Sequence, residues 1–306
     1  MKITIIGAGN VGGLTALRIA QDKIGEVCLI DVVPGMAKGK AYDLDDCRQI
    51  LNINYQIEGA DDINLVKNSQ IVVITAGLAR KPGMTREDLL NKNSQILKEV
   101  CEKVKVLAPD SVVIVVTNPL DSMVYYAKRI LGFPAQKILG MGITLDGSRF
   151  ANLISKELNI PPDEINPVVL GSHGEAMLPL PRFTWVRKKL LTEAISNPGL
   201  IKSLVQRTVE RGREIVSLLG AGSAYFAPSA AIAQIVRAIT NDEKKILGVS
   251  AYLNGEYGEK NVCAGVPCVI GKNGIEKIVE LDLNLEERKA FSESVEAIRK
   301  LNAIIK

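Results

Sequence analysis

The chain has 306 residues, of which 47% are hydrophobic and 24% charged, and its formal net charge is +4. This length suggests about two domains with ample material for a core, while the small net charge argues against nucleic acid or an anionic membrane as a partner. No apolar run reaches membrane-spanning length, and glycines interrupt the apolar N-terminal run too early for a signal peptide, so a soluble protein is expected.

The first half of the chain alternates short β-branched runs with helical patterns. Strands are expected at 2–7, 26–31, 54–59, 71–75, 111–116 and 137–140, and helices at 10–22, 37–47 and about 85–106. Continuous apolar strands separated by helices are typical of a parallel sheet that is covered on both faces. This half therefore predicts an α/β domain with a doubly wound parallel sheet.

The second half has a different pattern, with long amphipathic helices and strands that follow one another directly. Helices are expected at 145–158, 200–220, 228–240 and 286–306, and strands near 246–254, 262–270 and 274–281. The last two strands are joined by Gly271-Lys272-Asn273-Gly274, which indicates a hairpin. We expect a dinucleotide-binding domain at 1–143 and an α+β substrate domain at 144–306.

A glycine-rich turn follows the first expected strand. Gly7, Gly9 and Gly12 have the G-x-G-x-x-G spacing and open a helix, an arrangement that lets backbone N–H groups approach a pyrophosphate. The second strand ends in Asp31, whose carboxylate would accept hydrogen bonds from a ribose 2′-hydroxyl and repel a 2′-phosphate. The pattern favours NAD over NADP. The alternative is an ordinary glycine turn and an unrelated surface aspartate.

Two further strand ends carry candidate binding groups. The sequences TAG (75–77) and VTNP (116–119) follow the fourth and fifth expected strands, where ligands of doubly wound sheets bind. Asn118 and the backbone of Val116 and Thr117 would therefore meet the nicotinamide half of the cofactor. An ordinary Asn-Pro turn is the alternative.

The single histidine, His173, lies between Gly171 and Gly174 after an apolar run. That setting indicates a turn, and imidazole is the side chain whose ordinary pKa suits reversible proton transfer near neutral pH. Asp146 and Arg149 share one face at the start of a helix. They either form an ion pair with each other, or Asp146 orients the imidazole while Arg149 binds a carboxylate at two points. Their spacing leaves both readings open.

The chain resembles the lactate/malate dehydrogenase family, most of all its lactate-dehydrogenase-like malate dehydrogenases. The resemblance runs through nearly the whole sequence in the motifs GAGNVG, TAG, ARKPGMTR, TNP, LDGSRF and GSHGE, which occur in that order, with Asp31 between the first two. It implies an NAD-binding Rossmann domain, a substrate domain, and a mobile loop that closes over the active site.

The resemblance also implies roles for single residues. His173 resembles the family's proton acceptor, Asp146 its carboxylate partner, and Arg86 the loop arginine that polarises the C2 oxygen. The substrate-binding set is Arg80, Arg86, Asn118 and Arg149. The cofactor-binding set is Gly7, Ala8, Gly9, Asn10, Val11, Gly12, Asp31, Asn93, Val116, Thr117 and Asn118.

Two positions bear on the choice of substrate. Arg80 occupies the position where lactate enzymes generally have glutamine and malate enzymes have arginine, and Ala224 falls where many lactate enzymes have threonine. A dicarboxylate would pair with both Arg80 and Arg149, whereas pyruvate would leave Arg80 without an anion. The expected reaction is the reversible oxidation of (S)-malate to oxaloacetate with hydride transfer to NAD and proton transfer to His173, as in the tricarboxylic acid cycle.

The sequence also bears on metal binding, cellular compartment, rival functions and oligomeric state. The five cysteines have scattered spacings and no CxxC pair, so no metal is expected and reduced thiols indicate a cytoplasmic protein. A disulfide between Cys263 and Cys268 would require the fold to bring them together. Rival functions are dehydrogenation of lactate or another 2-hydroxy acid, an NAD-dependent glycosidase, and a silent NAD-binding module. The resemblance further implies a homodimer or homotetramer. Helices 37–47 and 228–240 are candidate contact faces, and burial in the core explains their amphipathic patterns equally well.

Overall fold

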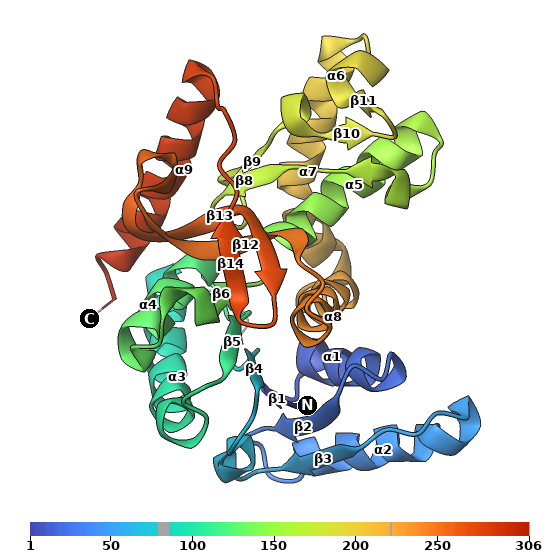
Figure 1. The fold of residues 1–306 in the computed structure, drawn as a ribbon, viewed down its shortest axis with the longest axis vertical. Coiled ribbons are helices and arrows are strands. Elements are labelled where there is room, and N and C mark those ends of the chain that lie inside the picture. Colours follow the sequence, from blue (N-terminus) through green and yellow to red (C-terminus); the bar gives the residue numbers. More distant parts are fainter. Residues whose placement is uncertain (79–85, 221, 306) are drawn as a thin grey trace.

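A parallel sheet forms the first half of the molecule in a computed structural model, which describes residues 1–78, 86–220 and 222–305 and, at Arg86, the backbone alone. The strands lie in the order β3-β2-β1-β4-β5-β6 (Figure 1). They span Lys2–Ile6 (β1), Glu26–Ile30 (β2), Ile57–Ala60 (β3), Ile71–Ile74 (β4), Val112–Val115 (β5) and Ile138–Gly140 (β6). This order confirms the doubly wound sheet. The strands are parallel, and the order in which the chain adds them reverses between β1 and β4, which is where ligands of such sheets bind.

Helices cover both faces of this sheet because alternate strand residues point to opposite sides. In β4, Ile71 and Val73 face one hydrophobic cluster, and Val72 and Ile74 face another. The first cluster is covered by α1, α2 and α8, and the second by α3 and α4. These helices span Asn10–Gln21 (α1), Met36–Leu51 (α2), Arg86–Leu107 (α3), Leu120–Leu131 (α4) and Phe226–Thr240 (α8).

The second half of the chain extends the same sheet with antiparallel strands. β12 (Lys245–Asn254) pairs with β6 through Ser250 and Gly140. A Cβ atom at position 140 would lie 2.9 Å from the Cβ of Ser250, so a glycine there lets the two strands meet. The sheet then continues through β13 (Lys260–Gly271), β8 (Val169–Gly171) and β9 (Met177–Pro179), with β14 (Gly274–Ile278) paired to β13.

The remaining elements surround this extension (Figure 1). α5 packs against α7 and α8, while α9 packs against α4 and β13. A separate small sheet has the order β11-β10-β7. The bounds are Ile143–Leu158 (α5), Ile165–Asn166 (β7), Trp185–Val186 (β10), Lys189–Leu190 (β11), Leu191–Ala194 (α6), Pro198–Leu219 (α7) and Leu285–Asn302 (α9). Among the described residues, no helix is both long and apolar enough to cross a bilayer.

Most expected elements are present, with shifted ends. The hairpin is confirmed, since Gly271 of β13 pairs with Gly274 of β14. The sequence reading missed α4, which occupies the stretch between β5 and β6, and it missed the very short strands of the second half. The division into domains at 143/144 falls in the first turn of α5 and stays a prediction. All five cysteines are free, so the pairing of Cys263 with Cys268 does not occur.

Candidate active site

The glycine turn after β1 has a shape that requires glycine at two of its three positions. Gly7 has a φ of +110°, a backbone region that favours glycine. A Cβ at Gly12 would lie 1.8 Å from the carbonyl oxygen of Gly7, so only a hydrogen atom fits there. A Cβ at Gly9 would meet nothing within 4 Å. The turn is therefore closed at Gly7 and Gly12 and open at Gly9, ahead of the N-terminus of α1 at Asn10, where a phosphate group could approach.

Asp31 lies at the carboxyl end of β2, beside this turn. One carboxylate oxygen accepts a hydrogen bond from the Ala8 N–H at 2.6 Å, and the other accepts one from the Val33 N–H at 3.0 Å. These two bonds fix the orientation of the carboxylate at the edge of the sheet. Each oxygen keeps a further lone pair with which to accept a ribose hydroxyl, so the residues present fit an NAD cofactor.

Asn93 joins the loops that follow β4 and β5. Its side chain is 1% exposed. Its oxygen accepts from the Leu78 N–H at 2.8 Å, and its nitrogen donates to the carbonyl oxygens of Asn118 at 2.7 Å and Leu78 at 3.3 Å. The structure thus gives Asn93 a role in bracing these two loops, while its predicted contact with the cofactor stays a prediction. Asn118 itself is exposed at the end of β5, next to a cis peptide bond with Pro119.

Asp146 brings together the histidine predicted for catalysis and Arg149, which was predicted to bind the substrate carboxylate. One of its oxygens lies 2.7 Å from Nδ1 of His173, and the other accepts a hydrogen bond from Arg149 at 2.9 Å. The side chain of Asp146 is fully buried, whereas those of Arg149 and His173 are 11% and 16% exposed. The ion pair between Asp146 and Arg149 and the contact of Asp146 with the imidazole are both present, because the two oxygens of one carboxylate have different partners. The binding of a substrate carboxylate by Arg149 stays a prediction.

The surroundings of His173 set its proton affinity. Burial alone would lower the pKa of the imidazole, but the charge of Asp146 and the hydrogen bond to it raise the pKa, with a smaller contribution from Asp121. The net effect is a pKa above the ordinary value of 6.5, even though the nearby Arg149 opposes it. The surroundings of the imidazole therefore favour its protonated form more than water does.

Asp121, in the first turn of α4, is a member of the site that the sequence reading missed. Its buried carboxylate accepts the backbone N–H of His173 at 2.8 Å and the hydroxyl of Ser250 at 2.7 Å. Because Asp121 follows the carboxyl end of β5, the bond to His173 brings the histidine to the edge where Asn118 lies. The available signal was its position three residues after Asn118, but an aspartate in the first turn of a helix ordinarily indicates only a charge near the helix N-terminus.

Two predicted arginines lie in the 77–86 segment, of which the structure describes only the two ends. Arg80 and the side chain of Arg86 lie outside the described residues, and the backbone of Arg86 begins α3. Ala224 is half-buried just before α8. Val116 is half-buried at the end of β5, and Thr117 is buried and donates its hydroxyl to the Ala76 carbonyl at 2.6 Å.

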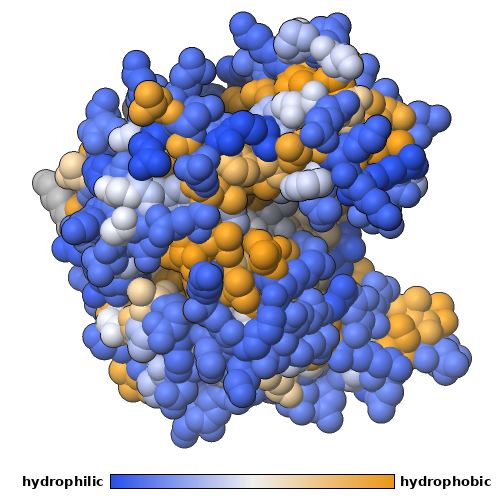
Figure 2. All heavy atoms as spheres, turned by 45° about the horizontal axis from the view of Figure 1, so that its top comes forward, coloured by the Kyte–Doolittle hydropathy of each residue, from blue (hydrophilic) through white to orange (hydrophobic). Residues whose placement is uncertain are grey.

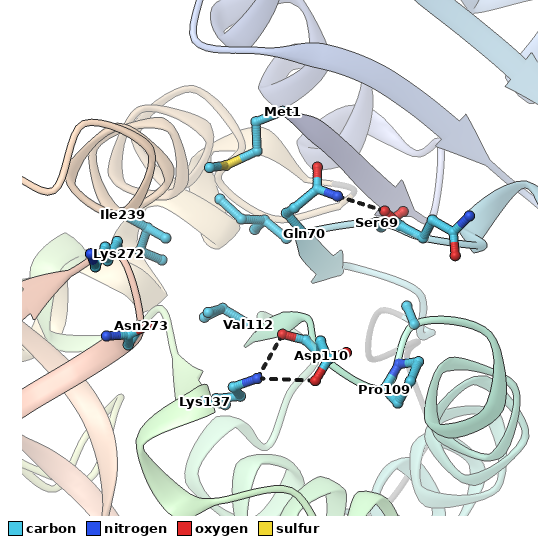
Figure 3. Close-up of a pocket in the computed structure, with 13 residues that line it drawn as sticks. Met1, Ser69, Gln70, Pro109, Asp110, Val112, Lys137, Ile239, Lys272 and Asn273 are labelled. Atoms are coloured by element: carbon cyan, nitrogen blue, oxygen red, sulfur yellow. Dashed lines mark hydrogen bonds and ion pairs between the residues drawn. The ribbon is translucent and has the colours of Figure 1, made fainter.

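A separate hollow of about 410 Å³ lies at the amino ends of the parallel strands (Figure 3). Its lining includes Met1, Gln70 and Val112, which stand at the amino ends of β1, β4 and β5. Lys137 donates to the carbonyl of Asp110 across its floor at 2.8 Å. Ligands of doubly wound sheets bind at the opposite, carboxyl edge, so this hollow is not part of the candidate active site.

The glycine turn, the aspartate after β2, and the imidazole with its carboxylate and guanidinium partners together define an NAD-dependent dehydrogenase. Two family models agree with this class: the lactate/malate dehydrogenase NAD binding domain matches residues 1–140, and the lactate/malate dehydrogenase alpha/beta C-terminal domain matches residues 143–305. The chain belongs to the lactate/malate dehydrogenase family.

Known relatives are similar along their full length. The chain is 45% identical over 305 residues to the malate dehydrogenase of Pelagibacter ubique, covering 98% of this chain and 95% of that one. Malate dehydrogenase from Cryptosporidium parvum has a similar structure, with a TM-score of 0.96, 40% identity and coverage of 99% and 98%. So does lactate dehydrogenase from the same organism, complexed with lactic acid and NAD, with a TM-score of 0.95, 34% identity and coverage of 99% and 97%.

Proposed function

We propose that this chain is a malate dehydrogenase, which interconverts (S)-malate and oxaloacetate with NAD⁺ and NADH. The observation that carries the proposal is that Asp146 fixes an imidazole and a guanidinium side by side on its two oxygens. A 2-hydroxy acid presents a carboxylate and a hydroxyl group on adjacent carbons, and these are the groups that a guanidinium and an imidazole bind. Relatives named malate dehydrogenase, 41–45% identical to this chain, support a four-carbon diacid as the substrate.

His173 moves the proton. Its Nδ1 faces Asp146, which leaves Nε2 as the nitrogen that meets the substrate oxygen. In malate oxidation the neutral imidazole accepts the hydroxyl proton at Nε2, and Asp146 stabilises the resulting imidazolium. In oxaloacetate reduction the imidazolium returns that proton to the oxygen on C2. The buried carboxylate thus fixes both the tautomer and the direction of the ring.

Arg149 binds and orients the carboxylate next to the reacting carbon. Its guanidinium is only 11% exposed and is anchored on one nitrogen by Asp146, so the substrate meets a donor pair that is already oriented. Arg86, by its resemblance to the loop arginine of the family, would stabilise negative charge on the C2 oxygen. Bound NAD supplies the hydride acceptor, and Asp31, with the open turn at Gly9, favours NAD over its 2′-phosphorylated form.

Arg80 would determine the choice of malate over lactate, because it can pair with the second carboxylate of the diacid. Arg80→Gln removes that partner, and we expect the ratio of kcat/KM for oxaloacetate to that for pyruvate to fall by about 10-fold or more. Lys81→Gln removes a neighbouring positive charge from the same segment and is the matched control, with an unchanged ratio. Rates with both acids, each with NADH and with NADPH, make the measurement.

Three outcomes would count against the proposal. A wild-type enzyme that prefers pyruvate would make it a lactate dehydrogenase. An enzyme that reduces neither acid would contradict the assignment to this reaction, and equal effects of Arg80→Gln and Lys81→Gln would contradict the role of Arg80.

The wider setting follows from the same assignment. We infer a cytoplasmic enzyme of the tricarboxylic acid cycle, with a substrate domain that begins near residue 144. We also infer a homodimer or homotetramer, and α2 supports it because Tyr42 is 61% and Ile50 80% exposed. Figure 2 shows hydrophobic side chains at the projecting part of the molecule that α2 forms. The apolar face of α8 is instead explained by burial, as for Ile232 and Ile235.

A further inference from the structure

The short loop that carries His173 is held from a helix far away in sequence. Ser294 lies on α9, 4% exposed, in the same buried stripe as Phe291, Val295 and Ile298. Its hydroxyl oxygen accepts the Ser172 N–H at 2.8 Å and its hydroxyl hydrogen is donated to the Ala176 carbonyl at 2.5 Å. A single hydroxyl therefore bonds to the backbone on both sides of His173.

The loop is built around this hydroxyl. Gly171 has a φ of +86°, and a Cβ at that position would lie only 2.4 Å from Oγ of Ser294. A side chain at position 171 would therefore displace the serine as well as strain the backbone. The glycine before the histidine and the serine on α9 are consequently two parts of one arrangement.

Hydrogen bonds from two helices define the position of the backbone at His173. Asp121 of α4 accepts the N–H of His173 itself, while Ser294 of α9 bonds to Ser172 and Ala176. The imidazole must reach Asp146 at 2.7 Å, so a small rotation of the loop would change that distance. Misplacing a catalytic group by about 1 Å can cost 100-fold in rate.

We propose that Ser294 is a positioning residue for catalysis, which acts through the 171–176 backbone to hold the imidazole of His173 against Asp146. The inference rests on the proposed proton transfer by His173. Ser294 touches neither substrate nor cofactor in this role. It holds the two sides of the loop together, and loss of its buried hydroxyl removes a hydrogen-bond partner from both the Ser172 N–H and the Ala176 carbonyl.

The test compares Ser294→Ala with Ser292→Ala, the same substitution at an exposed position of the same helix. We expect Ser294→Ala to lower kcat/KM for oxaloacetate by about tenfold or more, which corresponds to roughly 1.4 kcal/mol, and to leave the KM for NADH unchanged. Ser292→Ala should match the wild type. Equal kcat/KM values for Ser294→Ala and Ser292→Ala would overturn the proposal.

A second readout does not depend on turnover. The sequence has one histidine, so the imidazole signal of untagged, ¹³C-histidine-labelled protein reports His173 alone. Among the described residues, the charged groups that act on this ring are Asp146 and Arg149 from α5 and Asp121 from α4. In Ser294→Ala the ring should lose part of its contact with Asp146, and its NMR titration should shift down towards 6.5, the ordinary value. An unshifted titration would overturn the proposal even if the enzyme proved to use another substrate.

A stability control separates positioning from general support. Val295→Ala shortens a fully buried side chain on α9 and should lower the unfolding temperature while leaving the titration of His173 unchanged. If Val295→Ala shifts the titration as Ser294→Ala does, Ser294 has no special role and the proposal fails. If Ser294→Ala does not fold, hydrogen exchange of the wild type decides: the Ser172 amide should be protected, and exchange as fast as in an open loop would refute the contact.

Discussion

At the scale of single residues, the two oxygens of Asp146 decide how the site responds to pH. The pKa of His173 is raised because the attraction of Asp146 exceeds the cost of burial. Oxaloacetate reduction needs the imidazolium, so its kcat/KM should fall as pH rises through this raised pKa. Malate oxidation needs the neutral ring and should rise over the same interval. Both limbs, measured with saturating cofactor, should therefore have midpoints above 6.5.

The same pKa has a consequence for folding. The protonated His173 is favoured in the folded state, so its contribution to stability is complete below about pH 6.5, the unfolded value, and is lost as pH rises through the folded value.

Asp146→Asn removes the attracting charge while burial remains, and the midpoint of both activity limbs should move to lower pH. A midpoint that stays in place would show that Asp146 does not set the pKa.

At the scale of elements, Asp121 connects α4, β12 and the loop after β8 through Ser250 and the His173 backbone. Asp121→Ala leaves the buried Ser250 hydroxyl and the half-buried His173 N–H without this partner, and the expected loss in the free energy of unfolding is about 1–3 kcal/mol. Asp121→Asn can accept from His173 and donate to Ser250, so it should lose less. Burial raises the pKa of Asp121 despite the hydrogen bonds from Ser250 and His173 that lower it. Neutral asparagine therefore also avoids the cost of burying the charged form of this carboxyl group.

Chemical denaturation of the two Asp121 variants makes this measurement, with Asp110→Asn, at an exposed carboxylate on another loop, as the control. Equal losses for Asp121→Ala and Asp121→Asn would mean that the charge, rather than the hydrogen bonds, stabilises the connection.

The sequence predicted elements well where their pattern was long enough to read. β4 and β5 were recognised because each is a buried apolar run, and α9 because Phe291, Val295 and Ile298 repeat at helical spacing. β8 has only the three residues Val169–Gly171, and no periodicity can be read from so short a strand. Its place beside β13 depends on long-range pairing of Gly171 with Gly265.

The residues of the candidate site also differ in whether their neighbours in the sequence point to them. His173 was singled out by its flanking glycines and as the single histidine, whereas the spacing of Asp146 and Arg149 left two readings open and the resemblance supplied their roles. The structure places Asp146 in contact with both His173 and Arg149. Asp121 and Ser294 act through backbone groups that lie 52 and 122 residues away in the chain. Nothing in their own surroundings distinguishes them from a charge at a helix start or a serine in a buried stripe.

At the scale of the whole molecule, the two halves share one sheet. The sequence predicted two domains, but the contact between β6 and β12 rests on Ser250 meeting Gly140, which neither residue's neighbours indicate. β12 and β6 also lead to the two sides of the site. Ser250 of β12 donates to Asp121, and α5, which follows β6 in the chain, carries Asp146 and Arg149. The active site therefore depends on the continuity of this sheet and not on either half alone.

This continuous core also determines which thiols can react. Cys28, Cys101, Cys263 and Cys268 are buried and Cys47 on α2 is half-buried. Burial raises the pKa of Cys101 to about 12 and that of Cys263 well above its usual value, so the reactive thiolate is scarce as well as inaccessible. Alkylation of the native protein at neutral pH, followed by mass spectrometry, should therefore modify no more than one cysteine. The same reaction in guanidinium chloride should modify all five, and Cys47→Ser should abolish the native reaction. Rapid modification of a second thiol under native conditions would mean that the shared sheet opens far more readily than its packing implies.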